Sequence, residues 1–243
     1  MAAPRVRVVA AAEPLPDSIR LSIIIPVLNE ADRLGICLES VLSRPWARDS
    51  AEIIVCDGGS SDATAEVARG YPCKLLSSPA GRATQMNRGA EAARGDYLLF
   101  MHVDSHLPDD FEGSFPAGTE WGFFRLRLDD RSRIYRVIES SINIRTRLTY
   151  AAGGDQGLFF SRSLFDRIGG FPPIPLMEDL AICKRARQIG KPHIVESRLT
   201  SSSRRWQQNG VVKTILLMWS LRLAYLLGAD PRRLHRIYYP PQS

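Results

Sequence analysis

The chain has only four cysteines among 243 residues, and none of them belongs to a Cys-x-x-Cys pair or another metal-binding spacing. They are Cys37, Cys56, Cys73 and Cys183. Three of the four lie inside apolar stretches, so we expect reduced, buried thiols and a cytoplasmic protein. Internal repeats and low-complexity segments are also lacking. The apolar patch near the N-terminus is too short for a signal-peptide core, and residues 1–20 are predicted to be a mobile tail.

Basic and aromatic residues are not combined as they are in nucleic-acid-binding modules, so nucleic acid is not an expected partner. The composition, with 44% hydrophobic and 24% charged residues, is globular and excludes disordered and collagen-like chains. The net charge of +6 and the pI near 9.4 suit an anionic ligand such as a nucleotide diphosphate, or an anionic membrane surface. The length favours one large core.

Apolar strands and amphipathic helices alternate through the first hundred residues. Strands are predicted at residues 21–27, 51–56, 73–76 and 97–101, with helices at 31–42, 63–68 and 81–94. This β-α-β-α-β-α-β series predicts an α/β fold with a Rossmann-like, mostly parallel central sheet flanked by helices. The second half is less regular. It predicts strands at 120–128 and 156–160, and helices at 131–148, near Leu164, from about Met177, and at 211–227.

Polar side chains follow three of the predicted strands at the point where each strand ends. Asn29 and Glu30 follow the first strand, Asp57 follows the second, and His102 and Asp104 follow the fourth. The carboxyl ends of parallel strands meet at one edge of a sheet, where ligands bind. Carboxylates there can accept hydrogen bonds from a base or ribose, or bind a divalent ion that neutralises a diphosphate. As an alternative, Asp57 is only a turn residue before two glycines.

Two further places carry candidate groups. Arg82 follows a glycine at the start of a predicted helix, where a guanidinium and backbone N–H groups can converge on phosphate oxygens. A solvent-exposed arginine is the simpler interpretation. Glu178 and Asp179 open a helix after a proline-rich loop. Their carboxylates either interact favourably with the helix dipole, or one of them serves as a general base.

Five motifs occur in a fixed order: IIIPVLNE, VCDGGSSDAT, FMHVDS, GGF followed by MED, and RRW. Together they resemble the family 2 inverting glycosyltransferases of GT-A fold, short bacterial type, over about residues 21–206. The resemblance implies transfer of a sugar from a nucleotide-diphosphate donor, typically a UDP-sugar, to a hydroxyl acceptor. It implies a donor-binding half at 21–105, an acceptor half at 106–206 and a C-terminal helical extension at 207–243.

The resemblance also implies roles for single residues. Those implied to bind the donor are Pro26, Leu28, Glu30, Asp57, Arg82 and Asp104. Asp104 would bind Mg or Mn as the last acid of the family's Asp-x-Asp motif. His102 departs from that motif, and it either contacts the donor, ligates a divalent ion or packs. Asp179 would be the general base, with Glu178, Arg205 and Trp206 on the acceptor side.

The apolar run at residues 211–228 is interrupted by Lys213 and Arg222 and is short for a membrane span. It either packs against the domain, as most apolar helices do, or lies in a membrane interface. In the second case the arginines of 131–147 and 232–236 would face anionic lipid. The protein would then bind the inner face of the membrane peripherally, an interpretation that becomes attractive only if the acceptor is lipid-linked.

Two other functions compete with glycosyl transfer. A catalytically silent nucleotide- or lipid-binding protein of the same fold would explain His102, and Ser202 where the family has a Gln before the Arg-Trp pair. Intact Asp57 and Asp179 argue against it. A nucleotidyltransferase would need a glycine- and lysine-rich phosphate loop, which the segment LNEADRLG does not provide.

Overall fold

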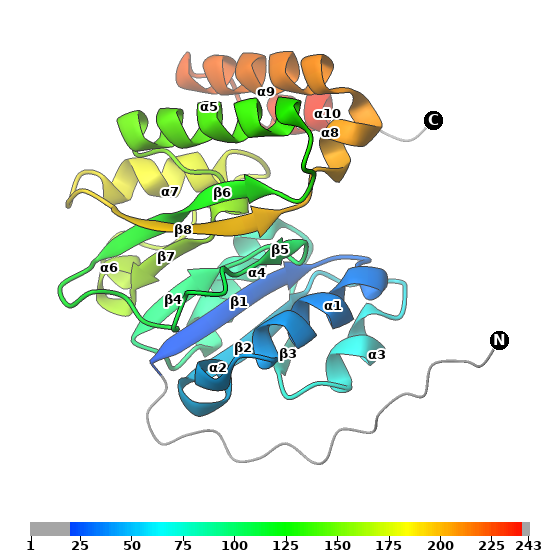
Figure 1. Ribbon diagram of the computed structural model, residues 1–243, viewed down its shortest axis with the longest axis vertical. Coiled ribbons are helices and arrows are strands. Elements are labelled where there is room, and N and C mark those ends of the chain that lie inside the picture. The colour runs from blue at the N-terminus through cyan, green and yellow to red at the C-terminus, as the bar shows by residue number, and fades with distance from the viewer. Residues whose placement is uncertain (1–19, 240–243) are drawn as a thin grey trace.

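The structure, a computed structural model, describes residues 20–239, so all but the last residue of the predicted tail lies outside the described residues. In this part of the chain one mixed sheet of eight strands has the order β3-β2-β1-β4-β7-β6-β8-β5 (Figure 1). The strands are β1 (Leu21–Val27), β2 (Ala51–Asp57), β3 (Lys74–Ser77), β4 (Tyr97–Phe100), β5 (Ser105–His106), β6 (Trp121–Leu128), β7 (Leu158–Ser161) and β8 (His193–Ser201). The predicted α/β fold with a mostly parallel sheet is confirmed.

Strands β1 to β4 form the parallel part of the sheet, and they pair in register. Val27 at the end of β1 pairs with Asp57 at the end of β2, and Ile24 pairs with Phe100 at the end of β4. The residues that follow these strands therefore reach the same edge. Nearly all side chains of β1 and β2 are buried, as expected for parallel strands that helices cover on both faces.

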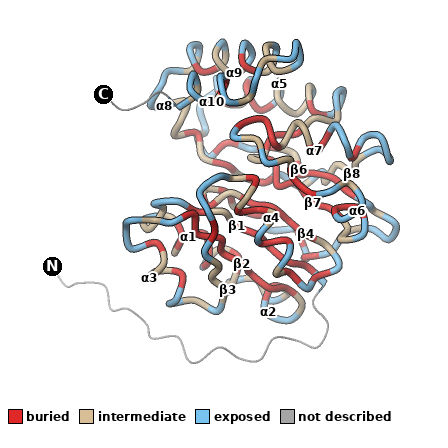
Figure 2. The backbone as a smooth tube through the Cα atoms, turned by 180° about the vertical axis from the view of Figure 1, so that it is seen from behind, coloured by how far each residue is buried: buried red, intermediate tan, exposed pale blue. Residues whose placement is uncertain are grey.

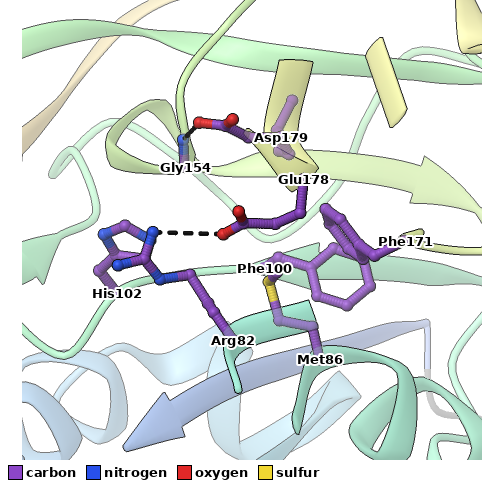
Figure 3. A pocket seen from close by; sticks show the side chains of 9 residues that line it. Arg82, Met86, Phe100, His102, Gly154, Phe171, Glu178 and Asp179 are labelled. Carbon is purple, nitrogen blue, oxygen red and sulfur yellow. Dashed lines mark hydrogen bonds and ion pairs between the residues drawn. The ribbon is translucent and has the colours of Figure 1, made fainter. Parts of the chain in front are cut away.

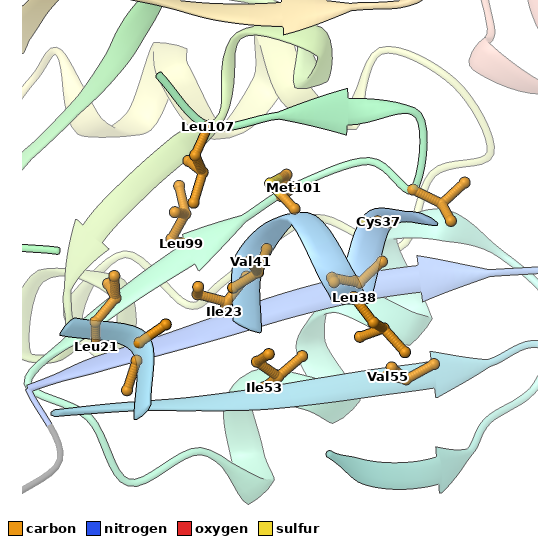
Figure 4. Packing of buried hydrophobic residues seen from close by; sticks show 14 of the residues in the cluster. Leu21, Ile23, Cys37, Leu38, Val41, Ile53, Val55, Leu99, Met101 and Leu107 are labelled. Carbon is orange, nitrogen blue, oxygen red and sulfur yellow. The ribbon is translucent and has the colours of Figure 1, made fainter. Parts of the chain in front are cut away.

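Helices cover both faces of the parallel strands. The helices of the described residues are α1 (Ala31–Leu42), α2 (Pro45–Ser50), α3 (Thr64–Arg69), α4 (Arg82–Ala92), α5 (Arg133–Thr149), α6 (Arg162–Arg167), α7 (Glu178–Ala186), α8 (Arg204–Asn209), α9 (Val211–Leu226) and α10 (Pro231–Tyr238), with a 3-10 turn η1 (Gly154–Gln156). Ile23 and Val55 pack with α1 in one core, shown in Figure 4. Ile24 packs with α4 and α7 in a second core. Alternate residues of β1 thus enter opposite cores.

The second half of the chain extends the sheet with antiparallel pairings. Strand β7 is antiparallel to β4 and β6, whereas β6 and β8 are parallel to each other. Strand β8 was not predicted, because most of its residues are only half-buried and its apolar pattern is weak. The short elements α2, β5, α8 and α10 were also missed. The strand predicted at 156–160 begins at Leu158, since Gln156 belongs to η1.

Helices α5, α8, α9 and α10 form an outer layer at one end of the molecule (Figures 1 and 2). Tyr135 and Ile138 of α5 are buried against β6, and Ile215 of α9 packs on the same cluster. Leu221 of α9 and Leu234 of α10 are buried near the start of α7. The predicted final helix therefore packs against the domain with one face. Of the helices within residues 20–239, none combines the length and apolarity needed to cross a bilayer.

Helix α4 lies close to the sheet at Gly89. A Cβ atom at this position would lie 2.4 Å from Ile24 Cγ2 and 2.9 Å from Cys56 Sγ. Both neighbours are fully buried, so neither can move aside. Glycine inside a helix costs roughly 0.5–1 kcal/mol relative to alanine, so its presence here reflects close packing. This packing sets the position of Arg82 and Gln85 near the start of the same helix.

We expect Gly89→Val to lower the free energy of unfolding by about 1–3 kcal/mol, because the new side chain overpacks the core between α4 and the sheet. Urea denaturation measures this loss. Gly190→Val is the matched control, since a Cβ atom there would meet nothing within 4 Å. Equal losses of stability in the two variants would contradict the close packing of α4.

Candidate active site

The loops that follow β1 and β2 are joined by side-chain oxygens. Asp57 Oδ1 accepts hydrogen bonds from the backbone N–H of Ser60 at 3.0 Å and from its hydroxyl at 2.5 Å. The N–H of Asn29 donates to Ser60 Oγ at 2.9 Å, and Asn29 Oδ1 accepts from the N–H of Ser61 at 2.8 Å. The two loops therefore hold Asp57 and Glu30 at one place on the sheet edge.

Gln85 connects the ends of the same two strands from beneath. Its Nε2 donates to the carbonyl oxygens of Val27 at 2.8 Å and Cys56 at 2.7 Å. The side chain is buried. A buried amide that satisfies two strand-end carbonyls holds them at a set separation, since leaving either group unpaired costs about 1–3 kcal/mol. We assigned Gln85 no role from the sequence, because a lone glutamine on a helix carries no pattern.

Backbone strain occurs directly before two of the candidate acids. Asn29 precedes Glu30 and has φ of 55°, and Met177 precedes Glu178 and has φ of 69°. Non-glycine residues in this left-handed region cost on the order of 1–3 kcal/mol, and such strain is concentrated at functional sites. Met177 is also buried, so packing maintains the conformation that directs Glu178 inward.

Asp104 lies in the turn after β4, among other acids. Burial raises the pKa of its carboxyl, and the negative charges of Glu30 and Asp155 raise it further. Glu30 follows β1 and Asp155 belongs to η1, so this carboxyl lies where the two halves of the chain meet. Acids from the strand edge and from the second half of the chain therefore lie close together.

The ring of His102 lies against the backbone of η1. A Cβ atom added to Gly154 would be 2.6 Å from His102 Nε2, so glycine is needed there. Nε2 is buried, and no hydrogen-bond partner for it exists within the described residues. Burial lowers the pKa of His102 to about 3, with the charges of Arg82 and Arg205 adding to the effect. The imidazole is therefore neutral.

A cavity of about 10 Å³ lies beside His102, and Arg82, Glu178 and Asp179 line it (Figure 3). Arg82 Nη1 donates to Glu178 Oε1 at 3.2 Å. Burial raises the pKa of the Glu178 carboxyl to about 7; Arg82 opposes this rise and Asp179 adds to it. The cavity has room for about one water molecule.

Asp179 is oriented by backbone donors at the start of α7. Its Oδ2 accepts from the N–H of Gly154 at 3.0 Å, the contact dashed in Figure 3, and its Oδ1 accepts from the N–H of Leu180 at 2.7 Å. Asp155 lies beside it, because a Cβ atom on Gly153 would be 2.4 Å from Asp155 Oδ1 and 3.5 Å from Asp179 Oδ2. Burial raises the pKa of Asp155; Arg222 lowers it and Asp179 raises it further.

Two C-terminal tyrosines close over the arginines of the site. Arg82 Nη2 donates to the hydroxyl of Tyr239 at 3.3 Å. The guanidinium carbon of Arg205 lies 4.1 Å from the ring centre of Tyr238 and 5.3 Å from that of Tyr239, a cation–π arrangement. Trp206, the next residue, instead packs in the apolar cluster beneath α5. Helix α10 thus touches the site, which the sequence did not indicate.

The sequence-predicted residues fall into two groups and one outlier. The strand-edge group consists of Pro26, Leu28, Glu30, Asp57 and Asp104. The cavity group consists of Arg82, His102, Glu178 and Asp179, with Arg205 close to His102. Trp206 is the outlier. Asp155 connects the two groups, because its negative charge raises the pKa of Asp104 and the charge of Asp179 raises its own pKa. Sequence reasoning missed this residue. Its only sequence signal is its place after two glycines.

The resemblance implies a divalent ion. Among the described residues, the carboxylate of Asp104 could bind such an ion, but no complete set of protein ligands surrounds the position. Within residues 20–239 no group of three His, Cys, Asp or Glu side chains is placed to hold a metal. Asp104 fits such an ion, because Mg and Mn prefer oxygen ligands and a cation would relieve the repulsion from Glu30 and Asp155. The unpartnered Nε2 of His102 lies against Gly154 and forms no such group with Asp104.

Comparison with known proteins gives a consistent result. Residues 22–113 match the family model described as glycosyl transferase family 2. An uncharacterised glycosyltransferase of Escherichia coli, YibD, is 36% identical over 94 residues, which cover 36% of this chain and 27% of that protein. The glycosyltransferase AglE of Haloferax volcanii is 33% identical over 91 residues, covering 35% of this chain and 30% of that protein. The chain thus matches less than a third of either relative's length.

A solved structure shows the same fold over a longer stretch. The mannosyltransferase PcManGT of Pyrobaculum calidifontis, in complex with GDP-Man and Mn2+, has a TM-score of 0.61 at 19% identity, over 85% of this chain and 61% of that one. At this level of identity the likeness shows the fold alone. The fold is that of GT-A glycosyltransferases.

We expect the contribution of Glu178 to the free energy of unfolding to fall as pH rises from about 4.5 to about 7, because the folded state holds a proton on Glu178 more tightly than the unfolded chain does. Stability from this group is complete below the unfolded pKa and is lost as pH passes the raised folded pKa. Glu178→Gln should remove this falling contribution, so that over this pH range the free energy of unfolding of the variant, measured by urea denaturation, should fall less or rise more than that of the wild type. Glu66→Gln, at an exposed carboxyl, is the control. An unchanged slope in Glu178→Gln would contradict the raised pKa.

Proposed function

We propose that this protein is an inverting glycosyltransferase, because residues 22–113 match the family model of glycosyl transferase family 2 and the described chain shares the fold of a glycosyltransferase structure. It moves a sugar from a nucleotide-diphosphate donor to a hydroxyl acceptor. The observation that carries the proposal is the meeting of two groups of acids, one from the strand edge and one from α7, with Asp155 between them. A binding protein without catalysis has no need of the second group.

The donor is proposed to lie along the edge formed by β1, β2 and β4. Pro26, Leu28, Glu30 and Asp57 would contact its base and ribose. The N-terminal part, residues 21–105, would form the donor half and residues 106–206 the acceptor half. Of the extension expected at residues 207–243, residues 207–239 are described and contain α9 and α10, and residues 240–243 lie outside the described residues. A UDP-sugar is the first choice of donor, since a structure of TarS from S. aureus, with a TM-score of 0.61 at 14% identity over 76% of this chain and 60% of that one, holds UDP.

The diphosphate is proposed to reach Arg82 and Asp104. Arg82 would leave Glu178 and Tyr239 and donate its guanidinium N–H groups to diphosphate oxygens, a charge-assisted contact that gains strength as the leaving group becomes more negative. Asp104 would hold Mg or Mn. When bound, such an ion neutralises charge on the leaving diphosphate.

Four free thiols in the structure agree with a reducing, cytoplasmic site of action.

Asp179 is proposed to act as the general base. Its carboxylate is oriented by the N–H groups of Gly154 and Leu180, so one lone pair of each oxygen is engaged and the others remain for a hydroxyl proton. The acceptor oxygen loses its proton to Asp179 and forms a bond to the anomeric carbon. The bond from that carbon to the diphosphate breaks on the opposite face, so the configuration inverts. Glu178 and Arg205 would position the acceptor, with Trp206 supporting them from the cluster beneath α5.

We expect Asp179→Asn to lower turnover by about 10²–10⁴-fold while leaving donor affinity within a factor of about two, because an amide takes up no proton and keeps only one of the two backbone N–H contacts. Product release and donor titration measure the two quantities. Asp166→Asn, at an exposed carboxylate of α6, is the matched control. Full turnover in Asp179→Asn would remove this residue from the proposed role.

We expect Asp104→Ala to weaken nucleotide binding in the presence of Mn by at least about tenfold, and to have little effect in the presence of a chelator, because a single carboxylate anchors the ion. Calorimetric titration of UDP- and GDP-sugars with and without Mn measures this difference. Failure of the wild type to bind any nucleotide sugar under either condition would overturn the proposed function itself.

A further inference from the structure

Helix α9 exposes a continuous stripe of large apolar side chains. Val212, Leu216, Trp219, Leu223 and Leu226 recur at alternating spacings of four and three residues, which places them on one side of the helix. Their exposed fractions run from 59% to 78%. Leu221 and Thr214, on the opposite side, are buried. The helix is therefore apolar on both sides, although only one of them packs on the domain.

The neighbouring helices continue this exposure. Val137, Ile144 and Leu148 of α5 are 61–77% exposed, and Ile237 of α10 is 58% exposed. Figure 2 shows the outer turns of α5 and α9 as exposed at the same end of the molecule. We call the exposed apolar residues of α9, α5 and α10 the outer apolar face. Large apolar side chains exposed in this number on neighbouring helices indicate a site of interaction rather than ordinary surface.

The charge around the outer apolar face has one sign. Residues 204–239 contain seven basic residues and one acid, and residues 131–150 contain five basic residues and one acid. These two segments together carry a net charge of +10, whereas the whole chain carries +6, so the remainder of the chain is net negative. The acid within 131–150 is Glu139, which is buried and paired with Arg136. Positive charge is thus concentrated on the outer helices.

We propose that the outer apolar face docks on an anionic lipid bilayer, with α9 lying in the membrane interface. Apolar side chains on such a helix enter the boundary between headgroups and acyl chains, while flanking lysines and arginines contact lipid phosphates. A second copy of this chain is the less suitable occupant, because a symmetric contact would bring the net positive charge of both copies together. Helix α9, with 16 residues, lies on the membrane and does not cross it.

This surface adjoins the acceptor side of the candidate site. Leu221 of α9 packs in one cluster with Met177 and Leu180, the residues on either side of Glu178 and Asp179. In agreement with this packing, the charge of Arg222 on α9 lowers the pKa of Asp155. If the proposed function holds, on which this step alone rests, the acceptor hydroxyl belongs to an amphiphile held in the bilayer. An acceptor of that class would meet Asp179 without leaving the membrane interface.

Flotation with phosphatidylcholine vesicles, with and without phosphatidylglycerol, tests the docking surface, and no nucleotide is added. We expect the wild type to bind the vesicles that contain phosphatidylglycerol, and binding to weaken with salt. The double variant Leu216→Ser/Trp219→Ser should lower the partition coefficient by about a hundredfold, since two large side chains no longer enter the interface. Lys213→Glu should lower it by roughly tenfold or more.

Matched controls lie on the other helices and loops. Ile36→Ser on α1 changes an exposed apolar residue, and Lys191→Glu changes an exposed lysine, both away from the outer apolar face. Lys74→Glu on β3, at the opposite end of the sheet order from β6 and β8, is the more remote lysine control. All three controls should bind like the wild type. Circular dichroism and the thermal midpoint establish that each variant is folded.

The proposal is overturned if the wild type fails to bind anionic vesicles, or if Leu216→Ser/Trp219→Ser binds as the wild type does. It is also overturned if sedimentation velocity shows a dimer that this variant dissociates while vesicle binding is absent. Donor titration without vesicles separates the two proposals. Vesicle binding without nucleotide-sugar binding would remove the proposed function and leave the docking surface intact.

Discussion

The in-register pairing of the parallel strands is the constraint on which the rest of the structure depends. Because Val27 pairs with Asp57 and Ile24 with Phe100, the residues after β1, β2 and β4 must emerge at one edge. Gln85 holds two of these strand ends together, and the contact of α4 with the sheet at Gly89 sets where Gln85 lies. Apolar packing thus determines where the polar groups of the site meet.

The second half of the molecule supplies the acids of η1 and α7, which the strand edge itself does not contain. Strand β7 pairs with β4, so η1 and the start of α7 are brought next to the turn that carries His102 and Asp104. The resulting concentration of acids is costly for the folded state, as the raised pKa values of Asp104, Asp155 and Glu178 indicate. Arginines from α4 and the outer helices offset part of this cost. If the proposed function holds, a bound diphosphate would compete with Glu178 for Arg82 and would thereby couple donor binding to the charge of Glu178.

The outer helices have two roles, one for their inner faces and one for their outer faces. Their inner faces complete the domain by packing on β6 and on the start of α7, and α10 brings two tyrosines over Arg82 and Arg205. Their outer faces remain apolar and are surrounded by basic residues. A single layer therefore closes the site on one side and presents a surface suited to anionic lipid on the other.

The sequence alone was sufficient for the strands of the parallel half and for helices α1, α3 and α4 between them, because buried strands and amphipathic helices have strong local periodicities. It also indicated Glu30, Asp57, Asp104 and Asp179 as candidates, since each follows a strand or opens a helix at a recognisable motif. Strand β8 was missed because its residues are mostly half-buried and lack that periodicity.

Only the tertiary structure decided that Asp155 lies between the two groups of acids, that Trp206 packs away from them, and that Tyr239 reaches Arg82. These relations join residues far apart in the chain, and no local pattern encodes them. The physical reason is that periodicity reports which side of an element is buried, whereas contacts between distant side chains depend on how whole elements pack.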